Sequence, residues 1–118
     1  MDTLETNNGK ELVVLCAANH YTKKYYLNPA FSKLPQSVKD QLEIACVVFT
    51  EQAGGELRIV FDDEGEMLLQ TFGSEEDFNY DEIGAGLMVK ELQKEKRELF
   101  QELTLFYRVV FLGEKIDL

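Results

Sequence analysis

The sequence predicts an α+β fold in which one four-stranded antiparallel sheet carries two helices. Short apolar runs have the length of strands, and a helical spacing of apolar residues begins at Pro35. A second and longer helical pattern covers residues 81–111. The predicted order is strand, strand, helix, strand, strand, helix (ββαββα), and the C-terminal helix is the long one.

The chain is predicted to hold one domain. Residues 1–10 are polar and lack periodicity, so they are expected to form a disordered leader. The single α+β domain is expected over residues 11–118.

The first two strands are predicted at residues 12–18 and 24–27. The first, Leu-Val-Val-Leu-Cys-Ala-Ala, lacks polar alternation and is typical of a strand covered on both faces. The second ends at Asn28-Pro29, because proline has no ladder donor. If both faces of the first strand are covered, a partner subunit is the simplest cover for the face that the helices leave open.

A helix and a hairpin follow. Pro35 suits a first-turn position, and apolar residues then recur at steps of four, three and four, at Val38, Leu42, Ala45 and Phe49. Gly54-Gly55 supplies the stop. Residues 57–61 and 67–72 are predicted to pair around the loop at residues 62–65.

In the long helix, apolar residues fall at alternating steps of three and four, and one lysine interrupts this seven-residue repeat. At about 1.5 Å per residue the helix would be about 45 Å long, more than a sheet of short strands needs. We therefore predict a homodimer interface on Val89, Leu92, Lys96, Leu99, Leu103 and Phe106, with Lys96 setting the register.

Charge narrows the classes of partner. Acidic residues outnumber basic ones by 22 to 12, so the protein is acidic and repels nucleic acid and anionic lipid. The first apolar run is shorter than the ~20 residues of a membrane span, and a cytoplasmic protein is expected. One acidic group is expected to cap the following helix or to capture a basic protein segment: Glu75, Glu76, Asp77, Asp81 and Glu82.

Few residues are suited to catalysis. His20 is the one histidine, and Cys16 and Cys46 lie among aliphatic residues as reduced core thiols. No spacing predicts a metal site or a cofactor, and an extended chain would hold Cys16 about 13 Å from His20. No catalytic residue is therefore assigned. A pocket around Cys16, His20, Tyr25 and Tyr26 is the candidate ligand site, because tyrosines are enriched at binding surfaces, although core packing also accounts for them.

Several stretches resemble a family of small acidic uncharacterised proteins of anaerobic Firmicutes. They are Val14-Leu15-Cys16-Ala17-Ala18-Asn19, Lys24-Tyr25-Tyr26-Leu27-Asn28, Leu34-Pro35 with Val38-Lys39, Tyr80-Asp81-Glu82-Ile83-Gly84, and Glu95-Lys96-Arg97-Glu98-Leu99-Phe100. The resemblance implies a free-standing cytoplasmic bacterial protein, and a domain of unknown function that supplies no catalytic residues.

Besides the capture of a basic segment by the acidic group, two functions remain open from the sequence. The first is a non-enzymatic protein-interaction or regulatory module that self-associates. The alternative is a small-molecule-binding domain or enzyme with a pocket between the sheet and the helices.

Overall fold

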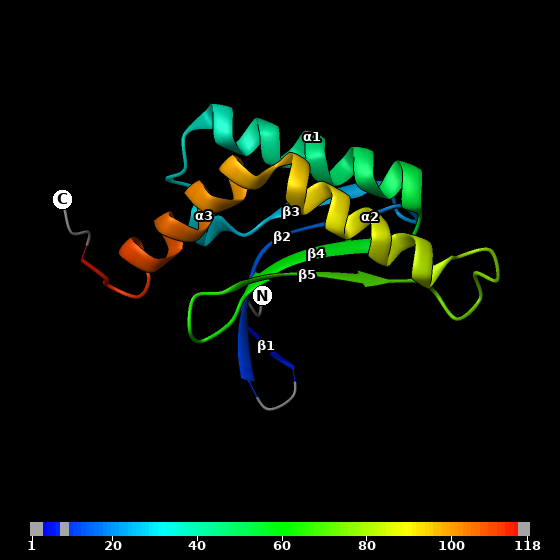
Figure 1. Ribbon diagram of the computed structural model, residues 1–118, viewed down its shortest axis with the longest axis horizontal. Helices are drawn as coiled ribbons and strands as arrows, with labels where there is room; N and C mark the ends of the chain where they lie inside the picture. Colours follow the sequence, from blue (N-terminus) through cyan, green and yellow to red (C-terminus); the bar gives the residue numbers. More distant parts are fainter. Residues whose placement is uncertain (1–3, 8–9, 116–118) are drawn as a thin grey trace.

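The computed structural model describes residues 4–7 and 10–115 of the chain (Figure 1). The predicted α+β class and the antiparallel sheet are confirmed. The elements are β1 (Leu4–Asn7), β2 (Lys10–Asn19), β3 (Lys24–Leu27), the 3-10 helix η1 (Pro29–Phe31), α1 (Gln36–Ala53), β4 (Glu56–Phe61), β5 (Met67–Phe72), α2 (Glu82–Glu95) and α3 (Arg97–Val110).

The sheet is built around the long strand β2. The strand order is β1-β2-β4-β5, and β3 also pairs with β2, beyond the segment that β1 covers. Figure 1 shows all three α-helices on one side of the sheet, while β1 and the first part of β2 project to the other side. Both predicted hairpins, β2–β3 and β4–β5, are present.

The predicted ββαββα order is wrong at its first element. Residues Leu4–Asn7 form β1 and pair with β2, so this part of the expected leader is a strand. Residues 1–3 and 8–9 lie outside the described residues. β1 is held by backbone pairing with β2, and its four residues show no apolar alternation from which a strand could be predicted.

The predicted long helix is two helices. Lys96 ends α2 and precedes α3, with φ −108° and ψ 27°, outside the helical region. A continuous helix would place Lys96 on the same side as Leu92 and Leu99, which are buried. Breaking the helix leaves the ammonium group exposed and avoids the cost of burying an unpaired charge.

The main core lies between the sheet and the helices. Leu57, Ile59 and Phe61 of β4 are fully buried there and pack against residues of all three α-helices. At one end of this core the rings of Phe61 and Tyr107 are nearly parallel, with centroids 4.2 Å apart, and Phe31 and Phe111 extend the stack. This stack anchors α3 to the sheet.

The middle of β2, at residues 12–16, has buried side chains on both faces of the sheet. The register between β2 and β4 shifts between Val14 and Cys16, so Leu15 is a bulge, and Leu15 and Cys16 both reach the main core. On the opposite face, Leu12 and Val14 form a second small cluster with Val60. The expectation that this strand is covered on both faces is therefore confirmed at these residues, while a partner subunit as the cover stays a prediction.

Candidate functional site

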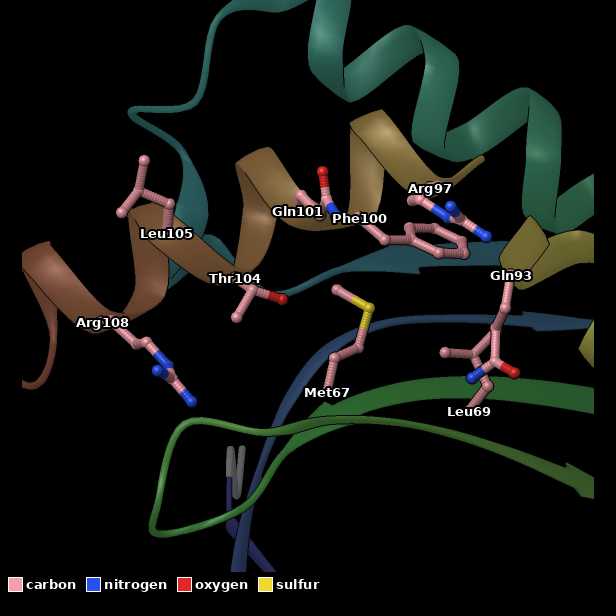
Figure 2. Close-up of a pocket in the computed structure, with 9 residues that line it drawn as sticks. All are labelled: Met67, Leu69, Gln93, Arg97, Phe100, Gln101, Thr104, Leu105 and Arg108. Atoms are coloured by element: carbon pink, nitrogen blue, oxygen red, sulfur yellow. The ribbon is translucent and has the colours of Figure 1, made fainter. Parts of the chain in front are cut away.

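A surface groove of about 400 Å³ runs between β5 and α3 (Figure 2). Figure 2 shows Met67 and Leu69 pointing from β5 towards α3, with Phe100 between the two elements. The groove is lined by Met67, Leu69, Gln93, Arg97, Phe100, Gln101, Thr104, Leu105 and Arg108.

Two periodicities bring these residues together. Alternate residues of a strand share a face, so Met67 and Leu69 both point to the helix layer. In α3, the steps from Arg97 to Gln101, Thr104 and Arg108 are four, three and four, which keeps these polar residues on one side of the helix. The adjacent side of α3 packs against the core through the buried residues Leu99, Leu103 and Tyr107. The helix thus packs with one side and lines the groove with the next.

The floor of the groove is apolar and partly open to solvent. Phe100 closes it from inside and is 7% exposed, while Leu105 at the rim is 51% exposed. Met67 and Leu69 are half-buried against the main core. An apolar ligand body that covered these side chains would remove further apolar surface from water, which stabilises binding.

The charged residues of the groove are two arginines. None of its nine lining residues is acidic, although the chain has 22 acidic residues and a net charge of −10. Arg108 is fixed, since its Nη2 donates to Oε1 of Glu66 at 2.9 Å and its Nε donates to the carbonyl of Gly65 at 3.4 Å. No ion pair holds Arg97 to another described residue. The Arg97 guanidinium is therefore available to an anion, and its planar donors suit carboxylate or sulfonate oxygens.

The lining of the groove is suited to binding rather than to proton transfer. Its polar side chains are two arginines, two glutamines and Thr104, and the lining includes no histidine, cysteine, lysine or carboxylate. Such a set offers hydrogen bonds and positive charge, but no group that exchanges a proton near neutral pH.

Of the four predicted ligand residues, Cys16 and Tyr25 lie together in the main core. Cys16 is fully buried, and its Sγ lies 3.8 Å from Sγ of Cys46 on α1. Burial and the neighbouring thiol raise the pKa of Cys16, and burial beside the two thiols also raises the pKa of Tyr25. The Tyr25 hydroxyl is buried without a hydrogen-bond partner in the described structure. The Cys16 thiol and the Tyr25 hydroxyl are therefore neutral near pH 7.

The other two predicted ligand residues lie elsewhere. His20 is at the surface, where Nδ1 lies 2.9 Å from Nζ of Lys23, and Lys23 also pairs with Glu51. Tyr26 packs on the opposite face of the sheet, against the small cluster of Leu12, Val14 and Val60. The four residues do not line one pocket, because successive residues of β3 point to opposite faces. A hollow of about 250 Å³ touches Tyr25, but neither Cys16 nor His20 lines it.

The predicted interface on the C-terminal helical pattern faces inward. Leu92, Leu99 and Leu103 are buried in the main core, and Val89 and Phe106 pack against it. α2 and α3 each need an apolar face to pack on the sheet, and these residues form it. These five residues therefore pack within the chain, whereas Lys96, the sixth residue of the predicted interface, is exposed.

The acidic stretch before α2 is partly used within the fold. Asp81 caps the helix, as expected, with its Oδ1 accepting from the amide of Gly84 at 2.9 Å. Oδ2 of Asp77 accepts from the Tyr21 hydroxyl at 2.7 Å. Capture of a basic segment by this stretch stays a prediction.

The groove residues were missed at the level of sequence. The polar row of α3 lies beside its apolar seam, and a row of this kind is usually a solvated helix face. One feature of the sequence could have indicated the groove. The predicted strand at residues 67–72 carries no charged residue.

A comparison with protein families identifies the family. A model described as a family of unknown function (DUF6145) matches residues 12–115, most of the chain. The chain belongs to the DUF6145 family. The expected membership of an uncharacterised family is thereby confirmed. No curated protein and no solved structure matches this DUF6145 chain.

The matched segment of the DUF6145 protein contains the whole groove, from Met67 to Arg108. Within the described residues, none of its helices is both long enough and apolar enough to cross a bilayer.

Proposed function

We propose that this DUF6145 protein is a non-enzymatic binding module, whose groove between β5 and α3 holds a ligand with an apolar body and an anionic group. The observation that carries the proposal is the lining of the groove, an apolar floor with two arginines and no carboxylate in a protein of net charge −10. Its volume of about 400 Å³ falls in the usual range of ligand sites, roughly 300–1,000 Å³.

The polar groups have separate roles in this proposal. Arg97 carries the charge that meets the anion, because it is exposed and without an ion-pair partner among the described residues. Arg108 and Glu66 neutralise one another and position the loop between β4 and β5. Gln101 and Thr104 lie between the two arginines along α3 and supply neutral hydrogen-bond groups.

The probe 8-anilinonaphthalene-1-sulfonate tests this function, since it joins an aromatic body to a sulfonate. We expect saturable fluorescence enhancement with one site per chain. Thr104→Phe fills the groove and should weaken binding at least about tenfold, and Arg97→Glu should weaken it several-fold by charge reversal.

Lys90→Glu is the matched control, because Lys90 is exposed on α2, lies outside the groove and gives the same change in charge. It should leave the dissociation constant within about twofold of the parent. Equal binding by the parent, Thr104→Phe and Arg97→Glu would refute the assignment of this groove.

We also propose that the module self-associates through the outer faces of α1 and α2, which replace the seam predicted from the sequence. Ile44, Val48, Ile83 and Leu87, here called the outer stripe, are all exposed, with Ile83 at 80%. All four side chains are apolar, so covering them with a second copy would remove apolar surface from water. The two helices that carry the stripe are about 27 and 21 Å long.

Light scattering after size-exclusion chromatography at tens of micromolar protein tests the self-association. The parent chain should elute as a dimer and Leu87→Glu as a monomer, because the new carboxylate would be buried without a partner. Phe78→Glu is the control, since Phe78 is 94% exposed in the loop before α2 and should leave the dimer intact. A monomeric parent chain would end this part of the proposal.

The bacterial cytoplasm is the setting that we propose for this module. The resemblance of its sequence to small acidic proteins of anaerobic Firmicutes supports it.

A further inference from the structure

We infer that the occupant of the groove is an extended polypeptide segment that adds to β5 as a further strand, with acidic and apolar residues alternating on its groove side. This inference rests on the proposed function, because it names the ligand class of the same groove. Three features of β5 and α3 support it.

The outer edge of β5 has no strand partner among the described residues. β5 is the last strand in the order β1-β2-β4-β5, and no other described strand pairs with it beyond β4. Its sequence, Met-Leu-Leu-Gln-Thr-Phe, has no charge and no proline, and its register with β4 has no bulge. Natural edge strands are usually blocked by lysine, proline or a bulge. An edge without any of these devices is suited to strand addition by a partner.

The length of the groove fits a strand. Arg97 and Arg108 lie on the same side of α3 and are 11 residues apart, which is about 16 Å along the helix axis. A five-residue strand covers most of this distance, since its first and fifth residues are about 13 Å apart at about 3.3 Å per residue. Residues one, three and five of such a strand point to the same face, and here that face is the helix layer.

Charge decides the type of strand. Residue one or residue five, depending on the chain direction, would lie near Arg97, where an acidic side chain complements the unpaired guanidinium. The other end would lie near Arg108, whose charge Glu66 already offsets. Residue three would lie over the apolar floor near Leu69 and Phe100. A second copy of β5 fits less well, because that strand has no acidic residue and would leave Arg97 unpaired.

The test uses a fluorescein-labelled peptide, Thr-Glu-Thr-Leu-Thr-Glu-Thr, blocked at both ends and read by fluorescence anisotropy. Its side-chain pattern is the same in both chain directions, so it fits a parallel or an antiparallel strand. We expect saturable binding that falls at least about tenfold when both glutamates are replaced by lysine. Arg97→Glu should also weaken binding of the glutamate peptide and strengthen that of the lysine peptide several-fold.

Two N-methylated peptides separate strand addition from side-chain binding. The first carries N-methyl groups on the first glutamate and the leucine, and the second on the third and fifth residues, both threonines. In a strand the amides of alternate residues point to the same edge, so only one of these peptides keeps its donors towards β5. We expect one of them to lose binding at least about tenfold and the other to bind within about threefold of the parent peptide.

Equal effects of the two methylation patterns would overturn strand addition. Absence of peptide binding, with sulfonate binding in the groove intact, would overturn the polypeptide occupant and leave the proposed binding function standing. A dimer of the protein that the peptide dissociates would assign the β5 edge to a second copy, and that result also contradicts this inference.

Discussion

Replacing Phe61 with alanine will lower the free energy of unfolding by about 3–5 kcal/mol, because the ring is fully buried and leaves a cavity. Its ring stacks on Tyr107 at 4.2 Å and on Phe31 at 6.1 Å between centroids, so the change separates β4 from α3 and from the segment before α1. Urea unfolding followed by circular dichroism measures the loss. Phe78→Ala is the matched control and should change stability by less than about 0.5 kcal/mol, since Phe78 is 94% exposed.

The loss of stability in Phe61→Ala should also affect the groove. Tyr107 and the groove residues Thr104 and Arg108 are on the same helix, so loss of the stack would loosen one wall of the binding site. A Phe61→Ala chain with the parent's stability would mean that the aromatic stack does not anchor α3 to the sheet.

Gly55→Ala is expected to cost about 3–4 kcal/mol of unfolding free energy. Gly55 has φ +68°, a region that costs an L-residue about 1–2 kcal/mol. An added Cβ would also overlap the carbonyl oxygen of Phe72 and the ring of Tyr80, and the backbone oxygen has no rotamer through which to move away. The carbonyl of Gly55 accepts from the amide of His20 at 2.8 Å, so any shift of this turn also disturbs β2.

Gly113→Ala separates the two causes. Gly113 has φ +69°, nearly the same backbone conformation, but an added Cβ there meets no atom within 4 Å. It should therefore cost only about 1–2 kcal/mol. Thermal unfolding compares the two variants, and a difference of roughly 8 °C is expected between their midpoints at roughly 4 °C per kcal/mol. Equal midpoints would show that backbone conformation alone accounts for the loss at Gly55.

Local patterns were sufficient to predict much of the fold. The strand predicted at residues 57–61 is present as β4, and its alternate residues Leu57, Ile59 and Phe61 lie in the core. The apolar steps after Pro35 indicated α1, which begins at the next residue. In both elements the periodicity itself specifies which face is buried.

Two features of the fold, β1 and the break at Lys96, were not predicted, for different physical reasons. β1 is held by backbone pairing with β2, and its short polar sequence shows no period. The break at Lys96 depends on where the sheet lies, since only tertiary packing determines that this position would face the core. Neither feature can be read from spacing alone.

The candidate site was less predictable than the fold. The tyrosines at positions 25 and 26 suggested a pocket, but their side chains lie on opposite faces of the sheet. The groove depends on the pairing of β5 with one side of α3, two segments about 30 residues apart that no local pattern links. From the sequence alone, Arg97 and Arg108 are typical of a solvated helix face. Only the tertiary structure shows that β5 lies beside them.

Methyl chemical shifts on titration with 8-anilinonaphthalene-1-sulfonate test the central claim, that this groove is the binding site. The account predicts that the methyl signals of Met67, Leu69, Thr104 and Leu105 shift saturably with one dissociation constant, and that those of Ile44, Val48 and Leu87 do not move. Shifts confined to these outer-stripe methyls, with the groove methyls unmoved, would contradict it.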